Sequence, residues 1–218
     1  MVYAHNEPTS FTASLLNIAQ GIFADAGHKV TVSDLYGVGF NPVAEKYDFN
    51  QMSLDHYNYM DEQFHAANHD WAYSVDIVGE LQKIQEADLI LFYFPLWWNG
   101  PPAILKGWLD RVLTKGTAWD GEHIFSTGKY RGKVAGVAVS VGEPESYYSA
   151  SGVQKASVTQ MLYPLLHGTL AFCGFNVLEP FVAHGLTVAN EFAIAEQLDA
   201  YRARLEKIDT EPRFLYRF

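Results

Sequence analysis

One segment, residues 89 to 113, constrains the fold of this chain more than any other. It begins with an unbroken apolar run from Leu89 to Phe94, which is typical of a strand buried on both faces. Pro95 ends the run. Gly100-Pro101-Pro102 then opens a helix, where proline suits the first turn because its missing N–H would have no partner. The apolar residues of this helix fall on one face: Ile104, Leu105, Trp108, Leu109, Val112 and Leu113. A buried strand followed by an amphipathic helix predicts an α/β sheet.

Two tryptophans, Trp97 and Trp98, occupy the turn between that strand and that helix. The turn lies at the carboxyl end of a strand, which is where open α/β sheets bind their ligands. The alternative is that both indoles belong to the core. A tight turn between Pro95 and Gly100 is a poor position for burial, so we favour side chains that face a ligand.

The rest of the chain repeats the alternation of strand and helix. Strand patterns cover Met1–His5, His28–Leu35, Lys133–Val141 and Phe175–Val182. Helical patterns run from a cap at Thr9-Ser10 to Gly27, and over Ser74–Ala87, Val153–Phe172 and Asn190–Ile208. Five strands that alternate with helices predict one doubly wound parallel sheet over residues 1–218, with helices on both faces and the flavodoxin-like order 2-1-3-4-5. The first strand is short, which would fit a start upstream of Met1.

Residues 36–73 interrupt this alternation. The segment is long, weakly periodic and rich in Asn, Asp, His and Tyr. A loop of this length in a compact domain is usually functional or an interface arm, so we expect an excursion rather than a second domain. His65 and His69, with His56 and Asp70 nearby, have the spacing of a metal pair, but a solvated loop is the stronger interpretation and we predict no metal.

The composition restricts the partners and the compartment. The formal charge is −10 and basic residues do not cluster, which argues against nucleic acid and anionic membranes as partners. Cys173 is the only cysteine, so an internal disulfide is excluded, and we expect a buried structural thiol. The sequence has no 18-residue apolar run and no signal-peptide pattern, which favours a cytoplasmic protein without membrane insertion.

Two further turns lie at the same predicted sheet edge as the tryptophans. The first, residues 5–14, places hydroxyls at a helix start, which suits a phosphate group or equally an ordinary helix cap. The second, residues 140–149, carries tyrosines that could donate a hydrogen bond to a bound ring or simply pack on a neighbour. The sequence has no Ser/His/Asp arrangement. Three such turns together favour a flat phosphorylated cofactor, and a flavin is the natural candidate.

The same turns carry a resemblance to a known family. Phe94-Pro95-Leu96, Trp98 and the run from Pro102 to Trp108 together resemble the signature of the NAD(P)H:quinone oxidoreductase family (DT-diaphorase type), a flavodoxin-like group. The similarity extends nearly end to end, through residues 5–11, Ser33–Tyr36, Phe40–Pro42, Tyr148-Ser149 with Gly152, and Phe172–Pro180.

This resemblance implies a homodimer that binds FAD, or FMN as the alternative, with each active site built from both subunits. It implies ping-pong hydride transfer from NAD(P)H to the flavin and then to a small quinone-like substrate. The implied contacts are His5, Phe11, Thr12 and Ala13 for the phosphates; Pro95, Leu96, Trp97, Trp98, Asn99, Ser140, Val141, Gly142, Glu143 and Tyr148 for the flavin ring; and Trp98, Asn99, Tyr148 and the partner subunit's Phe172 for the substrate.

Several positions depart from the family pattern. Tyr148 is the implied stabiliser of charge on the reduced flavin, but Gln154 stands where mammalian members have a histidine, so a Tyr–His relay cannot be transferred. Gln154 can form hydrogen bonds but not take up a proton. Glu143 replaces a glycine, and its side chain is expected to turn to solvent. Of the residues that bind a structural metal in one branch, only His167 remains, so the resemblance implies none here.

Two other functions stay open at this stage. Related flavoproteins are regulatory subunits of potassium-efflux systems, but they are shorter and carry FMN, and residues 36–73 fit the FAD branch better. A flavodoxin-type electron carrier would lack the segment from Trp98 to Trp108. The sequence does not choose among quinones and related acceptors, or between NADH and NADPH.

Overall fold

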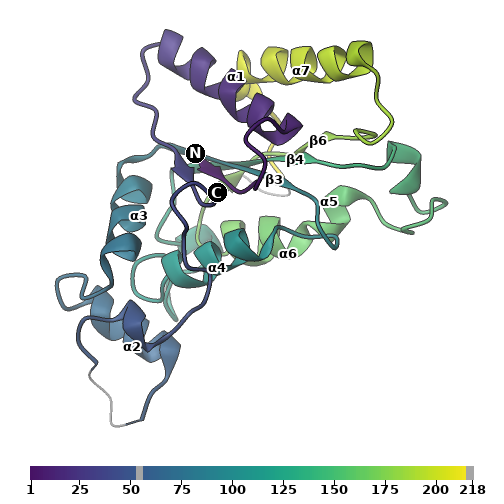
Figure 1. Cartoon of the computed structure of the whole chain (residues 1–218). Coiled ribbons are helices and arrows are strands. Elements are labelled where there is room, and N and C mark those ends of the chain that lie inside the picture. Colours follow the sequence, from purple (N-terminus) through teal and green to yellow (C-terminus); the bar gives the residue numbers. More distant parts are fainter. Residues whose placement is uncertain (53–55, 215–218) are drawn as a thin grey trace.

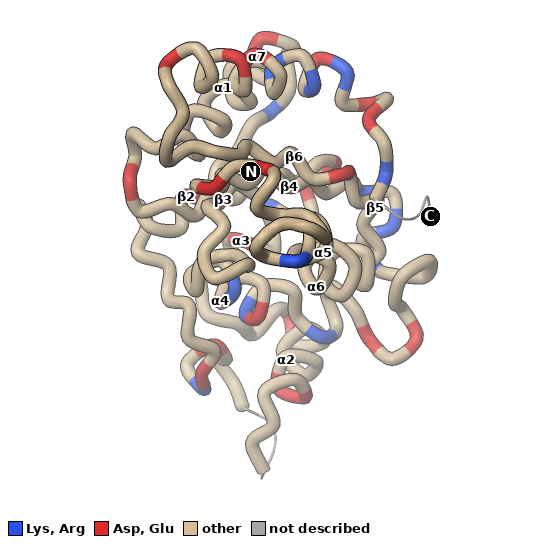
Figure 2. The backbone as a smooth tube through the Cα atoms, turned by 90° about the vertical axis from the view of Figure 1, so that its right-hand side faces the viewer, with Lys and Arg blue, Asp and Glu red and all other residues tan. Residues whose placement is uncertain are grey.

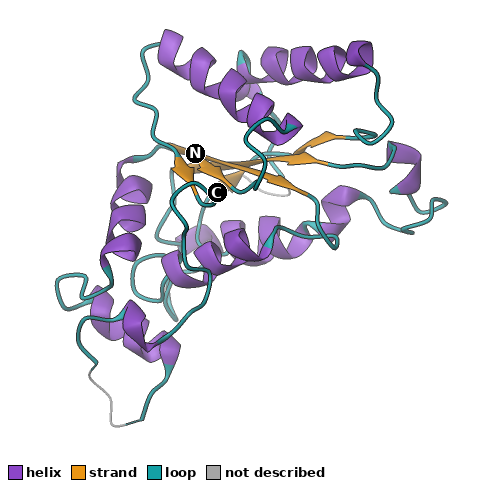
Figure 3. Cartoon of the chain, in the orientation of Figure 1, coloured by secondary structure: helices purple, strands orange, loops and turns teal. Residues whose placement is uncertain are grey.

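The computed structural model describes residues 1–52 and 56–214. In this part of the chain a six-stranded parallel sheet lies between two layers of helices (Figures 1 and 3). The strand order is β2-β1-β3-β4-β5, and β6 also pairs with β4. The strands are β1 (Val2–Tyr3), β2 (Ser33–Asp34), β3 (Leu89–Pro95), β4 (Val134–Ser140), β5 (Asn176–Val177) and β6 (Phe181–Ala183).

The expectation of five strands was wrong in one respect, because the predicted strand Phe175–Val182 is divided into β5 and β6. β5 and β6 each pair with β4 in the parallel direction, but the residues between them do not pair with β4. The N–H of Glu179 donates to the Pro212 carbonyl instead of to β4. Pro180 follows and has no N–H to donate, so pairing resumes only at Phe181.

The helices cover both faces of the sheet, as predicted (Figure 3). On one face lie α1 (Phe11–Asp25) and α7 (Glu191–Leu205). On the other lie α3 (Val75–Glu86), α4 (Ala103–Val112), α5 (Val158–Met161) and α6 (Tyr163–Leu165). The predicted helix Val153–Phe172 begins only at Val158, where Ser157 caps it, and widens into a π-helix, η4 (Leu166–Ala171).

Strand β3 is buried on both faces, which confirms the main prediction from the apolar run. Successive side chains of a strand point to opposite faces. Phe92 and Phe94 therefore pack into the larger core cluster with Trp108 of α4. Tyr93 points the other way, into the cluster under α1 and α7, where Tyr201 donates a hydrogen bond to its hydroxyl at 3.0 Å.

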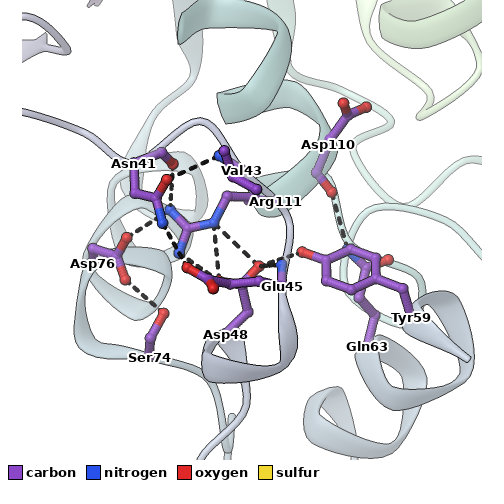
Figure 4. A network of polar contacts seen from close by, with 10 residues as sticks. All are labelled: Asn41, Val43, Glu45, Asp48, Tyr59, Gln63, Ser74, Asp76, Asp110 and Arg111. Atoms are coloured by element: carbon purple, nitrogen blue, oxygen red, sulfur yellow. Dashed lines mark hydrogen bonds and ion pairs between the residues drawn. The ribbon is translucent and has the colours of Figure 1, made fainter. Parts of the chain in front are cut away.

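The segment 36–73 extends away from the sheet and carries the short helix η1 (Lys46–Asp48) and α2 (Tyr59–Ala67); residues 53–55 within it lie outside the described residues. A buried ion-pair network ties it to α4 (Figure 4). The guanidinium of Arg111 binds Asp48 at 2.8 Å and Asp76 at 2.7 Å, and donates to the Asn41 carbonyl at 2.8 Å. Because Arg111 and Asp48 are almost fully buried, this network fixes the excursion to the core.

Acidic and basic residues are interspersed along the backbone in the view of Figure 2. Among residues 1–52 and 56–214, no helix is both long and apolar enough to cross a bilayer.

Candidate functional site

The turn between β3 and α4 projects an indole into solvent. Trp97 and Gly100 exchange two backbone hydrogen bonds, at 3.0 and 3.1 Å, and close a two-residue turn. Trp98 and Asn99 form its centre, with φ of +49° and +59°. The Trp98 side chain is fully exposed, at 101%, and Trp97 is 41% exposed. Neither tryptophan belongs to the core, so the alternative of two buried indoles is wrong.

The backbone of this turn is strained. Left-handed φ values at both central positions are typical of Asn-Gly turns, and they are unfavourable for a residue as bulky as tryptophan. Strained residues cluster at ligand clamps, where the surrounding structure holds them in place. The strain at Trp98 therefore points to a binding role for the turn.

The structure brings the three sequence-predicted turns together at one edge of the sheet. Pro95 pairs with Ser140 at the carboxyl ends of β3 and β4, and the N–H of Leu96 donates to the Ser140 carbonyl at 2.9 Å. The hydroxyls of Ser140 and Thr12 lie 2.6 Å apart, and both residues are buried. From the first turn, the His5 ring lies 6.0 Å from that of Trp97.

In the first turn, the hydroxyls that the sequence offers for phosphate already have partners within the chain. The Thr9 hydroxyl donates to Glu7 at 2.7 Å, and Ser10 caps α1 by accepting from the Ala13 N–H at 3.2 Å. Thr12 bonds Ser140. The N–H groups of Phe11 and Thr12 have no acceptor within the helix, as at any helix start. Backbone donors, rather than hydroxyls, are therefore the groups that remain for an anion.

Backbone hydrogen bonds join the loop after β4 to the end of β6 and the loop that follows it. Val141 donates to the Ala183 carbonyl at 2.8 Å, and Thr187 donates to the Gly142 carbonyl at 3.1 Å. A Cβ on Gly142 would lie 2.6 Å from the Thr187 hydroxyl, so only glycine fits without a shift. The carboxylate of Glu143 is on an exposed residue, in line with the expectation that it turns to solvent.

Tyr148 is half-buried in this loop and keeps its proton. Burial raises the pKa of its phenol, and the nearby Glu143 carboxylate and Tyr147 raise it further. A protonated phenol is a hydrogen-bond donor. Gln154, also half-buried, lies beside it in the fold, since its N–H donates to the Tyr147 carbonyl at 3.0 Å.

The remaining residues that the sequence suggested for a site lie away from the three turns. Phe172 packs on Trp119 and Phe125, with ring centroids 5.6 and 5.4 Å apart, and lines a separate hollow of about 410 Å³. The ring centroids of His65 and His69 lie 3.8 Å apart with the rings tilted by 31°. His65 lies in α2, a helix that the sequence did not indicate, and His69 follows its end. Among the described residues no group of three or more His, Cys, Asp or Glu side chains could hold a metal. Cys173 is buried, as predicted.

Two residues that the structure identifies as important, Arg111 and His184, were not predicted from the sequence. Arg111 lies on the apolar face of the predicted helix, and a cation in that position is a signal for a buried carboxylate partner. His184 follows β6, and its ring lies 5.7 Å from that of Tyr148. Nothing in the local sequence distinguishes His184, because its neighbours at the site come from distant segments.

The residues present fit a flat group with a phosphate tail. Trp98 offers an open π-face at the sheet edge, and the helix start of α1 offers free N–H groups. Among residues 1–52 and 56–214, the N–H groups of Trp98, Asn99 and Gly142 donate to no protein acceptor. A planar heterocycle with carbonyl and nitrogen acceptors along its edge matches this set of donors.

Comparison with known proteins agrees with this geometry. A family model described as "Flavodoxin-like fold" matches residues 1–206. The protein is therefore of the flavodoxin-like class.

Its relatives define the family more narrowly. The chain is 41% identical over 212 residues to a ribosyldihydronicotinamide dehydrogenase (quinone) of Pongo abelii, covering 95% of this chain and 90% of that protein. It is 37% identical to NAD(P)H dehydrogenase (quinone) 1 of Cavia porcellus, covering 95% and 76%. The chain belongs to the NAD(P)H:quinone oxidoreductase family.

Solved structures share the fold. A Klebsiella pneumoniae protein described as a quinone reductase superposes with a TM-score of 0.91 at 31% identity, covering 99% of this chain and 86% of that one. A general stress protein 14 from Treponema denticola, solved in complex with FMN, gives a TM-score of 0.66 at 26% identity, covering 96% of each chain.

Proposed function

We propose that this protein is a flavin-dependent oxidoreductase that reduces quinones by two-electron transfer from NAD(P)H. The observation that carries the proposal is the strained turn at Trp98, which holds an exposed indole beside the free N–H groups of the β3 and β4 loops. The names of the relatives support the same reaction, since those proteins are named dehydrogenases of reduced nicotinamides with quinone as the acceptor.

The bound flavin supplies the chemistry of accepting a hydride from the nicotinamide and passing it to the quinone. The residues of the chain do the rest. Trp97 and Trp98 provide the surface for the ring, and the N–H groups of Trp98, Asn99 and Gly142 bind its polar edge. Tyr148 donates a hydrogen bond where negative charge develops, which is worth most in a partly buried site. Quinone and nicotinamide occupy the same open face in turn.

We propose FAD rather than FMN as the cofactor. Residues 36–73 form an extra body beside the flavodoxin-like core, fixed to it by Arg111, and an adenine nucleotide needs more surface than FMN does. The FMN-bound neighbour is the observation that favours the smaller cofactor. The phosphates would lie at the start of α1, near His5, Phe11, Thr12 and Ala13.

We also propose a homodimer with shared active sites, in the cytoplasm, where NAD(P)H is available. Within one chain, Phe172 packs against Trp119 and not against the Trp98 turn. Its implied place in the substrate slot therefore requires a second copy. The hollow beside Phe172 is lined partly by residues of α2 and α4, which offer a surface for that copy. Dilution should release activity and flavin together, whereas an active monomer on a sizing column would rule out shared sites.

One experiment tests the function directly. The purified protein is denatured, and the released yellow compound is identified by chromatography against FAD and FMN. Reduction of a benzoquinone by NADH and NADPH is then followed with the reconstituted holoenzyme. We expect one FAD per chain and quinone-dependent oxidation of the nicotinamide. A colourless protein that takes up neither flavin would overturn the proposal.

A further inference from the structure

His184 occupies a fixed position at the edge of the candidate site. It directly follows β6, and the preceding residue, Ala183, accepts a hydrogen bond from Val141 at 2.8 Å. From the opposite side, the side-chain amide of Gln197 on α7 donates to the His184 carbonyl at 3.1 Å. The backbone on both sides of the residue is thus tied to the loop after β4 and to α7.

The imidazole is directed towards Tyr148 and has an unused buried nitrogen. The two rings lie 5.7 Å apart with an interplanar angle of 43°. The Nδ1 atom of His184 is buried and has no hydrogen-bond partner among the described residues. An unpaired buried polar atom is unfavourable because it has lost its hydrogen bonds to water, so such atoms are rare in native proteins unless they serve a purpose.

The groups around this imidazole favour its neutral form. Burial lowers the pKa of His184, and the Glu145 carboxylate and the Glu143 backbone act weakly in the opposite direction. From the loop after β4, the Glu145 carboxylate, the Glu143 backbone and the Tyr148 ring face this imidazole. From α7, the uncharged amide of Gln197 contacts the backbone of the histidine. A neutral imidazole beside a protonated phenol can accept a proton as soon as negative charge appears nearby.

Given the proposed function, on which this inference rests, we propose that His184 positions Tyr148 and takes up one proton from solvent when a hydride brings negative charge to the site. The hydride leaves NAD(P)H as two electrons and one proton, and NAD(P)⁺ departs. A quinone needs two electrons and two protons to become a hydroquinone. The hydride supplies both electrons and one proton, and the imidazolium N–H bond breaks to supply the second. His184 returns to its neutral form, so the protons and electrons balance.

The reduction potential of the bound flavin measures this proton uptake independently of turnover. In a two-electron couple, each proton taken up shifts the potential by about 30 mV per tenfold change in proton concentration. A reduction that binds one proton on the flavin and one on His184 gives about 60 mV per pH unit. This slope applies at pH values above the pKa of His184 in the oxidised protein and below its pKa in the reduced protein, because only there does reduction protonate the imidazole. We expect that window to begin below pH 6.5, because burial lowers the pKa in the oxidised state.

Two variants test the inference in the holoenzyme. His184→Phe keeps an aromatic ring against Tyr148, and His184→Gln keeps a polar group but cannot titrate. Each should lower the slope from about 60 to about 30 mV per pH unit between pH 6 and 8. The control is His28→Phe, which removes an exposed histidine whose ring contacts Phe23. His28 precedes β2, the edge strand on the other side of the sheet from β6. This control should keep the wild-type slope.

The outcomes separate the two proposals. If a His184 variant binds flavin and keeps the full slope, the histidine takes up no redox-linked proton and the inference is wrong. The glutamine variant decides the matter if the phenylalanine variant does not fold. If the wild-type protein binds no flavin, the proposed function itself fails, and the inference fails with it.

Discussion

Gly107 and Pro42 touch backbone to backbone, and no side chain fits between them. A Cβ built on Gly107 would overlap the carbonyl oxygen and the Cα of Pro42. Gly107 lies on the buried face of α4, and Pro42 lies near the start of the 36–73 excursion. The glycine in the run from Pro102 to Trp108 therefore has a structural purpose, since it lets the excursion lie directly against the helix that follows the aromatic turn.

Gly107→Ala should destabilise the fold because either α4 or the Pro42 segment must move. Overpacking of this kind costs about 1–3 kcal/mol. The matched control is Gly79→Ala on α3, where an added Cβ meets nothing within 4 Å. Alanine is favoured over glycine inside a helix by about 0.5–1 kcal/mol, so the control should gain stability. Urea unfolding followed by circular dichroism measures both, and equal midpoints for the two variants would contradict the close contact.

Arg111→Met should cost much more, because it leaves Asp48 buried without its cation. Breaking a buried ion pair from one side costs about 3–5 kcal/mol. The Tyr59 hydroxyl still donates to Asp48 at 2.6 Å but cannot neutralise it. Lys106→Met is the control, since Lys106 and Asp110 form an exposed pair worth about 0–1 kcal/mol. Asp48→Asn added to Arg111→Met should restore part of the loss, and a purely additive double variant would argue against a coupled pair.

The sequence predicted those elements whose patterning is local. The apolar runs located β3 and β4 to within a residue or two, and Ser10 and Asn190 marked helix starts that the structure confirms. The second strand was predicted too long, at His28–Leu35, because its alternation was taken for pairing. Only Ser33–Asp34 pairs, since the neighbouring β1 is itself two residues long.

The site was predictable only where a turn follows a strand. Parallel strands bring their carboxyl ends to one edge, so residues 5–14, 95–100 and 140–149 had to meet there once the sheet was inferred. The strain at Trp98, the Arg111 network and the approach of His184 to Tyr148 depend on tertiary contacts across many residues, which no local pattern encodes. Val75 shows the same limit, since it is an apolar residue of α3 and is nevertheless 87% exposed.

The Cys173 thiol should be unreactive in the native protein and should make stability fall at high pH. Burial raises its pKa to about 12, from an ordinary value of 9.0. At a pH between these two pKa values, the thiol is therefore deprotonated in the unfolded chain and protonated in the folded protein. The contribution of Cys173 to the free energy of unfolding is therefore complete below pH 9, and it declines by about 1.4 kcal/mol per pH unit above pH 9. Urea midpoints at pH 8, 9 and 10 should fall more steeply in the wild type than in Cys173→Ala. Parallel slopes would contradict the assignment.

Trp98→Gly should separate binding from stability. The indole is fully exposed, so its removal loses no packing, and glycine relieves the left-handed strain. We expect the free energy of unfolding to change by less than about 1 kcal/mol. Flavin affinity, measured by titrating the apoprotein and following the quenching of flavin fluorescence, should fall at least tenfold. Trp98→Phe retains a π-face and should keep most of the affinity. Equal affinity in the glycine variant would remove the indole from the binding site.

Tyr148→Phe should slow hydride transfer without releasing the flavin. The phenol remains protonated because burial and Glu143 raise its pKa, so it acts as a donor, and phenylalanine keeps the ring packed against His184. Loss of one such hydrogen bond in the transition state should cost about 1.4 kcal/mol or more, a rate decrease of about tenfold or greater. Stopped-flow reduction of the flavin by NADH measures this rate, with Tyr147→Phe as the neighbouring control. An unchanged rate would exclude Tyr148 from the mechanism. A slower rate combined with a wild-type pH slope of the potential would show that Tyr148 donates its hydrogen bond while His184 still takes up the proton.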